Sequence, residues 1–260
     1  MASRINIPRR LRRRRIRSKR AARHQGQQAY LITSEQARAA GAASTDVGKI
    51  LFERTDRPVF KWSHYLDAYE AEFGAFRGRP VRVLEIGVYK GGSLQVWRDY
   101  FGPDARIFGI DIDPTCAEID NDEGISVRIG SQDDPEFLAR VIDEMGGVDI
   151  ILDDGSHVAR HQRTSFETLF PLLSEGGVYA VEDLHTSYWP DYGGKYGRGD
   201  GFIELAKHLI DDMHGWYHVK TNHYSQIDAK LTIPKIVIYD SMVFIYKTTK
   251  ARPSNFITGA

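Results

Sequence analysis

Two carboxylates and a histidine follow an apolar run in the stretch VDIILDDGSHVARHQ, residues 148–162. The run has the composition of a buried strand, and it ends in Asp153 and Asp154, with His157 close behind. Charge at the end of a buried strand destabilises a fold unless it is paired or used. We therefore interpret this strand end as part of a functional site, in which the charged side chains are paired or used.

A second acidic pair, Glu182 and Asp183, ends another apolar segment, GVYAVED, residues 177–183. We expect the two strands to be neighbours, so that four carboxylates converge on one small region. Like charges this close raise each other's pKa unless a cation lies among them. Oxygen ligands favour Mg²⁺, Mn²⁺ or Ca²⁺ over zinc. The alternative is that these acids are helix caps and lysine-paired surface side chains.

Zinc is the less favoured metal for this site. His157 and His161 are four residues apart and could share one helix face, but the His-Glu-x-x-His pattern of zinc hydrolases is missing. The single cysteine, Cys116, excludes a cysteine-cluster zinc site and an internal disulfide. For His157, the structural alternative is a histidine at a helix start that hydrogen-bonds to the backbone.

A glycine-rich turn follows the first expected strand, in the stretch LEIGVYKGGS, residues 84–93. Its glycines, Gly87, Gly91 and Gly92, would let a ligand approach the backbone, and a helix N-terminus follows. The second glycine of the dinucleotide fingerprint is missing, as is the Lys-Ser/Thr pair of a phosphate-binding loop. The turn therefore disfavours an NAD-dependent oxidoreductase and, by itself, identifies no cofactor.

The second expected strand ends in the stretch GIDID, residues 109–113. Asp111 falls 24 residues after Gly87, near the place where an acidic side chain accepts hydrogen bonds from ribose hydroxyls. The alternative is that Asp111 or Asp113 caps the helix that begins at Pro114.

The third expected strand ends in the stretch GSQDD, residues 130–134. Its polar side chains Ser131, Gln132 and Asp133 could hold the edge of an adenine ring. The alternative is that Asp133 or Asp134 caps the helix that follows.

These strand ends belong to a regular alternation of apolar strands and helices. We expect strands over residues 81–86, 105–112, 125–130, 148–154 and 177–183, with helices over 91–101, 114–120, 134–145, 160–173 and 200–214. Residues 235–248 predict two further strands in an antiparallel hairpin around Asp240 and Ser241. The pattern predicts an α/β fold with a doubly wound, mostly parallel sheet covered on both faces. Ligands of such sheets bind beyond the carboxyl ends of the strands.

The rest of the chain divides by composition. We expect a basic, disordered arm over residues 1–28, a helical segment over 29–79 that covers the site, the main domain over 80–250 and a tail over 251–260. In the helical segment, Thr33 and Gln36 form a possible capping box. The stretch KWSHYLDAYEAEF, residues 61–73, has apolar residues at helical spacing.

The formal net charge of zero is the sum of a basic N-terminal arm and an acidic remainder. Residues 1–23 hold eleven Lys and Arg and no acidic residue, which leaves 24 basic and 35 acidic side chains in the remainder, a net charge of −11. An acidic body argues against broad nucleic-acid binding. The arm could contact RNA, an anionic membrane or an acidic partner, or be a solvated tail or the product of a misassigned start codon. No membrane span or signal peptide is visible, so we expect a cytoplasmic protein.

Together these motifs resemble the class I S-adenosylmethionine-dependent methyltransferases, whose first motif is similar to LEIGVYKGGS. DDGSH followed by VEDL, the earlier STDVGKI and the closing IVIYDSMVFIYK resemble the metal-dependent sugar O-methyltransferases of macrolide and related antibiotic pathways, the mycinamicin and macrocin type. The resemblance spans roughly residues 45–247, without the basic arm. It implies a seven-stranded Rossmann-like sheet and a homo-oligomer. The mycinamicin type carries an additional N-terminal domain that 260 residues cannot hold, which leaves oligomer contacts and substrate choice open.

The resemblance also implies residues that bind the cofactor, S-adenosylmethionine. Glu85, Gly87 and Lys90 would line its methionine end. The other implied contacts are Asp111 with the ribose, Ser131 and Gln132 with the adenine, Asp153 beside the cofactor, and Thr45, Asp46 and His64 bordering cofactor or substrate.

For catalysis, the resemblance implies that Asp154, Glu182 and Asp183 hold Mg²⁺ and that His157 is the general base. A metal chelated by two adjacent sugar hydroxyls would lower the pKa of one of them. His157 would then accept its proton, and the oxygen would attack the sulfonium methyl group in line.

The loop HTSYWPDYGGKYGRGDG, residues 185–201, fits a lid. Its glycines would allow movement. Its aromatic residues could stack on sugar or polyketide faces: Tyr188, Trp189, Tyr192 and Tyr196. The alternative is a structural loop with exposed tyrosines.

The sequence thus predicts a Mg²⁺-dependent O-methyltransferase that uses S-adenosylmethionine and acts on a sugar hydroxyl of a glycosylated natural product, a macrolide or another polyketide. One alternative is an RNA-directed methyltransferase that uses the basic arm, although the Asn/Asp-Pro-Pro-Tyr motif of amino methylation is missing. Another is a non-catalytic, partner-binding protein on the same fold, because a fold does not fix a function.

Overall fold

The computed structural model describes residues 31–54, 56–120, 124–197, 199–219 and 227–259. The expected basic arm, residues 1–28, lies outside them. The chain divides into two compact units, residues 1–42 and 43–260. In the first unit, helix α2 (Ser34–Ala39) begins with the predicted capping box: Thr33 Oγ1 accepts the Gln36 N–H at 3.1 Å, and Gln36 Oε1 accepts the Thr33 N–H at 2.8 Å.

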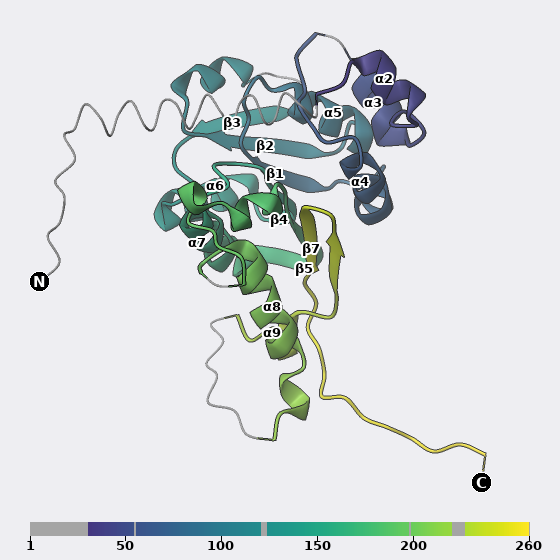
Figure 1. Ribbon diagram of the computed structural model, residues 1–260, viewed down its shortest axis with the longest axis vertical. Coiled ribbons are helices and arrows are strands. Elements are labelled where there is room, and N and C mark those ends of the chain that lie inside the picture. Colours follow the sequence, from purple (N-terminus) through teal and green to yellow (C-terminus); the bar gives the residue numbers. More distant parts are fainter. Residues whose placement is uncertain (1–30, 55, 121–123, 198, 220–226, 260) are drawn as a thin grey trace, which may run out of the picture. The chain divides into compact units, whose positions relative to one another are not determined.

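The second unit contains a seven-stranded sheet in the order β3-β2-β1-β4-β5-β7-β6 (Figure 1). Its strands are β1 (Arg82–Ile86), β2 (Arg106–Asp111), β3 (Ile125–Ile129), β4 (Val148–Asp153), β5 (Leu173–Val181), β6 (Ile236–Tyr239) and β7 (Met242–Tyr246). Strands β3, β2, β1, β4 and β5 pair in parallel, while β7 is antiparallel to both β5 and β6. The predicted mostly parallel sheet with a C-terminal hairpin is therefore confirmed.

Helices cover both faces of this sheet (Figure 1). Helices α6 (Pro135–Met145), α7 (Ala159–Leu169) and α8 (Phe202–Met213) pack in sequence on one face, and α3 (Asp46–Glu53), α4 (Tyr65–Phe73) and α5 (Gly92–Phe101) gather on the other. The short helix α9 (Ala229–Thr232) packs against α8. The short 3₁₀ helices are η1 (Gly74–Phe76), η2 (Pro114–Ile119), η3 (Phe170–Leu172), η4 (Leu184–Tyr188), η5 (Pro190–Tyr192) and η6 (Gly215–Tyr217).

Two cores hold these layers together. On the α6–α8 face, the ring centroid of fully buried Phe166 lies 5.0 Å from that of Phe170 and 5.0 Å from that of Tyr179, which are also fully buried. On the other face, Phe73 of α4 packs its ring edge-on against Trp97 of α5. Among the described residues, no helix combines the length and apolar character that crossing a membrane requires.

This topology has its switch point between β1 and β4, because β2 and β3 extend the sheet from β1 in one direction and β4 and β5 extend it in the other. The carboxyl ends of β1, β4 and β5 therefore lie side by side. Such an edge is the usual ligand site of open α/β sheets. Glu182 and Asp183 follow β5, and Asp154 follows β4, so the predicted carboxylates meet at this edge.

Candidate active site

The carboxylate at the very end of β4, Asp153, is fully buried and held by the protein itself. It accepts hydrogen bonds from Ser165 Oγ at 2.7 Å, from Gln132 Nε2 at 3.1 Å and from Tyr179 OH at 3.3 Å. Burial raises the pKa of Asp153, although the Ser165 and Gln132 hydrogen bonds oppose this shift. Because Gln132 Oε1 also accepts the Ser156 N–H at 2.6 Å, Asp153 and Gln132 together fix the loop after β4.

The next carboxylate, Asp154, meets a lysine that the sequence analysis did not include in the site. Lys61 Nζ lies 2.5 Å from Asp154 Oδ2 and 2.9 and 3.0 Å from the two oxygens of Glu182. Glu85 Oε1, at the end of β1, is 3.8 Å from the same ammonium. The Lys61 side chain is only 7% exposed, so this is a buried cluster of one cation and three carboxylates.

The charges of this cluster are unbalanced. Burial opposes the ammonium form of Lys61, but Asp154, Glu182 and Glu85 outweigh it and hold the Lys61 pKa well above its usual value. Burial also raises the pKa of Glu85 to about 7 and, together with the charge of Asp154, raises the pKa of Glu182 well above its usual value. One ammonium therefore does not neutralise the three carboxylates, which favours a further cation.

Two phenols from α4 complete the enclosure of the acidic residues. Tyr69 OH donates a short hydrogen bond to Glu182 Oε1, and Tyr65 OH donates to Asp183 Oδ1 at 2.8 Å. Burial, reinforced by the adjacent carboxylates, raises the pKa of both phenols, so both remain protonated donors. Tyr65 and Tyr69 thereby fix the side chains that follow β5.

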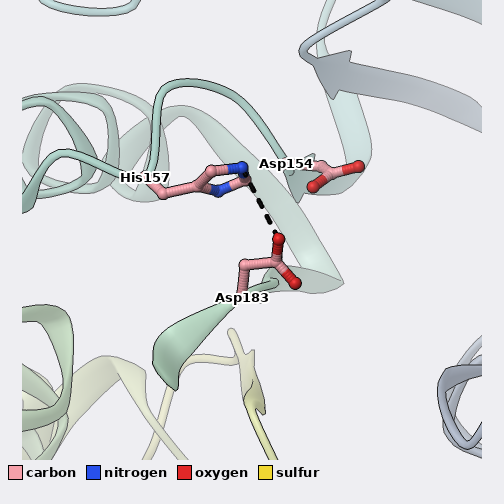
Figure 2. A group of neighbouring side chains, drawn as sticks. All are labelled: Asp154, His157 and Asp183. Carbon is pink, nitrogen blue, oxygen red and sulfur yellow. Dashed lines mark ion pairs between the residues drawn. The ribbon is translucent and has the colours of Figure 1, made fainter. Parts of the chain in front are cut away.

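Asp154, His157 and Asp183 form a group that fits a metal ion. Each offers one ligand atom, and these atoms lie within 4.8 Å of one another (Figure 2). His157 Nε2 is 3.6 Å from Asp183 Oδ2. Glu85 Oε1, 3.8 Å from the Lys61 ammonium, is buried with no hydrogen-bond partner in the part of the chain that the structure describes. A donor set dominated by carboxylate oxygens fits a hard divalent cation such as Mg²⁺.

The group of possible metal ligands in the structure differs from the set predicted from the sequence. Asp154 and Asp183 belong to the group of Figure 2, whereas both oxygens of Glu182 are held by Lys61. His161 does not join any group with metal-binding spacing among the described residues. Its Nδ1 lies 2.9 Å from Ser156 Oγ instead, and its Nε2 lies 3.6 Å from Asp133.

The backbone is strained where the histidine and the acid face each other. His157 has φ +55° and Asp183 has φ +54°, in the left-handed region that few residues other than glycine adopt. Thr186 Oγ1 ties the two loops together, since it donates to the carbonyls of His157 and Asp183 at 3.3 and 2.8 Å. Strain of this kind concentrates at functional sites because the surrounding structure must stabilise it.

At the end of β2, Asp111 binds the glycine-rich turn. Its Oδ2 accepts the Val88 and Tyr89 N–H groups at 2.9 and 3.1 Å, and its Oδ1 accepts the Asp113 N–H at 2.9 Å. The cap of the following 3₁₀ turn is Asp113, whose Oδ1 accepts the Thr115 N–H at 2.9 Å. Asp111 is therefore positioned beside the turn rather than used as the cap.

Other predicted contacts have structural partners of their own. Thr45 caps α3 by accepting the Gly48 N–H at 3.1 Å, and Asp134 caps α6 by accepting the Glu136 and Phe137 N–H groups at 3.1 Å. Ser131 Oγ accepts the Asp133 N–H at 3.1 Å. The predicted contacts Asp46, His64 and Lys90 also have neighbours in the protein. Asp46 pairs with Lys49 and Arg77, and His64 Nε2 lies 3.2 Å from the Asp240 carbonyl oxygen. Lys90 is exposed beside Tyr89. The cofactor roles of these residues stay predictions.

The glycine at position 87 is required by the crossing of two loops. Gly87 has φ +97°, and a Cβ there would lie 2.3 Å from the Asp154 carbonyl oxygen. The Gly87 N–H donates to the Ile110 carbonyl at 2.8 Å, and the Asp154 N–H donates to the Ile86 carbonyl at 2.9 Å. This close packing of the glycine turn on the β4 end brings the cofactor side and the metal side of the site together.

Gly87→Ala should lower the free energy of unfolding by about 3 kcal/mol or more, since the new Cβ is both strained and blocked by backbone. The matched control is Gly176→Ala, because Gly176 has φ +78° with nothing among the described residues within 4 Å of a Cβ. Gly176→Ala should lower the free energy of unfolding by about 1 kcal/mol, because alanine is strained in left-handed backbone but its Cβ meets no other atom. Urea denaturation of both variants measures the difference, and equal losses would show that the contact with Asp154 is unimportant.

A row of aromatic rings borders the acidic group. Trp62 and His185 have ring centroids 5.8 Å apart, His185 and Trp189 4.9 Å, Trp189 and Tyr192 5.9 Å, and Tyr192 and His157 6.5 Å. Burial lowers the pKa of His185, which favours its neutral ring. The expected lid, residues 185–201, supplies most of this row from η4 and η5, while Tyr188 and Tyr196 remain exposed. The row is half-buried and offers a stacking surface next to His157.

Comparison with known proteins gives a consistent result. A family model described as a methyltransferase domain matches residues 84–184. An 8-demethyl-8-(2-methoxy-alpha-L-rhamnosyl)-tetracenomycin-C 3'-O-methyltransferase of Streptomyces olivaceus is 46% identical over 187 residues, which is 68% of this chain and 47% of that protein. The mycinamicin VI 2''-O-methyltransferase of Micromonospora griseorubida is 39% identical over 202 residues, 70% of this chain and 49% of that protein. The chain thus spans about half the length of these relatives.

Among solved structures, the mycinamycin-pathway methyltransferase MycE in complex with Mg and SAH aligns with a TM-score of 0.69 at 33% identity, covering 79% of this chain and 54% of that one. The same enzyme with Mg, SAH and mycinamycin VI aligns with a TM-score of 0.68 at 31% identity. The alignment covers 85% of this chain and 63% of that one. These alignments show that the chain shares the Rossmann-like methyltransferase fold of that enzyme.

Proposed function

We propose that this chain transfers a methyl group from S-adenosylmethionine to a sugar hydroxyl of a glycosylated natural product, with Mg²⁺ as the metal. Two findings support this: the chain carries a methyltransferase domain of the class I fold, and it resembles the sugar O-methyltransferases of macrolide and polyketide pathways. The observation that carries this proposal is the convergence of Asp154, His157 and Asp183 at the switch-point edge.

The metal would be held by Asp154 and Asp183, and by Glu182 once its oxygens are released from Lys61. When bound, Mg²⁺ would lower the pKa of a chelated sugar hydroxyl. Tyr65 supports this arrangement because its phenol fixes Asp183 at 2.8 Å. Buried carboxylates held by protein donors keep their geometry, and positioning supplies a large part of the rate in such transfers.

His157 would accept the proton of the acceptor hydroxyl. The Asp183 carboxylate, 3.6 Å from its Nε2, would orient the imidazole and stabilise its protonated form. The strained loop that carries His157 keeps the ring beside the carboxylates rather than in solvent. The acceptor oxygen would then bond to the sulfonium methyl group as the S–CH₃ bond breaks, with S-adenosylhomocysteine as the leaving group.

The cofactor would lie across the glycine-rich turn. Asp111, already aimed at the Val88 and Tyr89 amides, would receive the ribose hydroxyls, with Glu85 and Lys90 toward the methionine end and Ser131 toward the adenine. Asp153 and Gln132 would act by holding the loop that forms the floor, since their polar atoms bond to protein groups. The aromatic row from Trp62 to Tyr192 would stack against the acceptor sugar.

Calorimetric titration of the purified protein with S-adenosylhomocysteine tests the cofactor assignment, with NAD as the control ligand. Stoichiometric binding of S-adenosylhomocysteine alone supports the proposal. Turnover of glycosylated macrolides and polyketides, with and without Mg²⁺, then tests the acceptor class. A folded protein that binds neither ligand would instead favour a partner-binding role on a methyltransferase fold.

A further inference from the structure

Lys61 occupies oxygens that a divalent metal would need. Its ammonium lies within 3.0 Å of both Glu182 oxygens and 2.5 Å from Asp154 Oδ2. We propose that Lys61 is the resident cation of the metal site: it pairs with Asp154 and Glu182 while the metal is absent and leaves them when a divalent cation binds. This inference rests on the proposed function, because it concerns the same metal site.

Direct competition follows from the geometry. Mg²⁺ binds carboxylate oxygens at about 2.1 Å and demands a nearly octahedral set of ligands. A metal that bound Glu182 would have to share oxygens with the ammonium, since Lys61 contacts both of them and Tyr69 contacts Oε1 as well. A metal that shared these oxygens would lie about 5 Å or less from the ammonium, where two cations in a buried site repel strongly. Either the metal leaves Glu182 alone or Lys61 moves.

The charges favour the exchange. Three carboxylates surround Lys61, and Glu85 Oε1 is fully buried without a hydrogen-bond partner among the described residues, 3.8 Å from the ammonium. A single positive charge cannot balance all three carboxylates in their ionised form, whereas a divalent ion balances one carboxylate more. The released ammonium would regain its hydration in water, which offsets the loss of its ion pairs.

Lys61 is also placed to move, because it belongs to a connecting loop and not to a helix. Residues 56–64 join α3 to α4 without regular structure apart from a turn. The same loop covers the glycine-rich turn: a Cβ at Gly92 would lie 2.6 Å from the Pro58 carbonyl oxygen, and Arg57 Nη1 donates to the Lys90 carbonyl at 3.2 Å. Displacement of Lys61 would therefore alter the loop that lies over the expected methionine end of the cofactor.

Manganese titration of the full chain, without cofactor or acceptor, tests the competition. Lys61→Met keeps the length of the side chain and removes its charge, and should raise the Mn²⁺ affinity about tenfold or more. Lys61→Arg retains the charge and should stay within about threefold of the original protein. Lys207→Met is the matched control, because Lys207 is exposed on α8 and pairs only with Glu204 among the described residues, at 2.7 Å.

Lysine labelling of the unmutated protein tests the displacement directly. An amine-reactive reagent, read out by peptide mass spectrometry, should modify Lys61 slowly without metal and several-fold faster with saturating Mn²⁺. Lys207 should react equally in both states. This measurement does not depend on the folding of any variant.

The outcomes separate the two proposals. If the unmutated protein binds Mn²⁺ but Lys61→Met binds it no more tightly, or if Lys61 stays protected in the metal-bound state, Lys61 is a fixed structural counter-ion and this inference is wrong, while the proposed function stands. If neither the original protein nor Lys61→Met binds Mn²⁺, the metal part of the proposed function fails and this inference fails with it.

Discussion

Asp154→Asn should reduce metal-dependent turnover by about 10³-fold or more, a loss of about 4 kcal/mol of transition-state stabilisation. Asp154 belongs both to the group of Figure 2, with His157 and Asp183, and to the cluster around Lys61. An amide of the same shape cannot supply the charge that holds a hard cation. The affinity for S-adenosylhomocysteine should change no more than about threefold, because the glycine turn and Asp111 are untouched.

Initial rates at saturating acceptor and varied Mg²⁺, together with calorimetry of S-adenosylhomocysteine, measure the two effects separately. The matched control is Asp99→Asn, which removes an exposed carboxylate of α5 that pairs with Arg54. It should leave both quantities unchanged. Equal loss of turnover and cofactor affinity in Asp154→Asn would mean that Asp154 supports the cofactor side and that the metal assignment is incorrect.

The fold could be predicted because its signals are local. Apolar runs defined the five parallel strands, and caps such as Asp134 before Pro135 defined helix starts. The clearest error concerns the helix expected over residues 160–173. Helix α7 ends at Leu169, a 3₁₀ turn includes Pro171, and β5 already begins at Leu173. Pro171 has no N–H with which to continue the helix, so α7 ends before it and the backbone is already extended at Leu173.

The acidic side of the site could be predicted for the same reason. Asp154, Glu182 and Asp183 directly follow strands that must be neighbours in a doubly wound sheet, and topology alone brings them together. The φ values of His157 and Asp183 had no signal in their residue types, because left-handed backbone outside glycine is set by the surrounding fold.

Lys61, Tyr65 and Tyr69 could not be assigned from the sequence. The stretch that contains them predicts a helix from its apolar spacing, and the two tyrosines contribute to that spacing as apolar residues. Their site contacts join positions 93 to 121 residues apart, which only the tertiary fold creates. A lysine just before an apolar helix gives no indication of burial, since lysine is almost never fully buried without a partner.

His157→Asn should lower kcat by about 10² to 10⁴-fold, the usual contribution of a general base. Asparagine is the appropriate replacement because it tolerates the left-handed backbone, and His157 has φ +55°. The variant should therefore fold and keep the loop after β4 in place. Its affinity for S-adenosylhomocysteine should remain within about threefold of the original value, since the glycine-rich turn and Asp111 are intact.

His161→Asn provides the matched control, four residues further along the chain. His161 contacts Ser156 Oγ at 2.9 Å and does not belong to the acidic group among the described residues. Its loss should reduce kcat by no more than about threefold, because it touches the loop and not the reacting atoms. Added imidazole should restore part of the activity of His157→Asn and none of the activity lost in His161→Asn. Comparable losses in both variants, without rescue, would show that the histidines stabilise the loop and that another group, or water, accepts the proton.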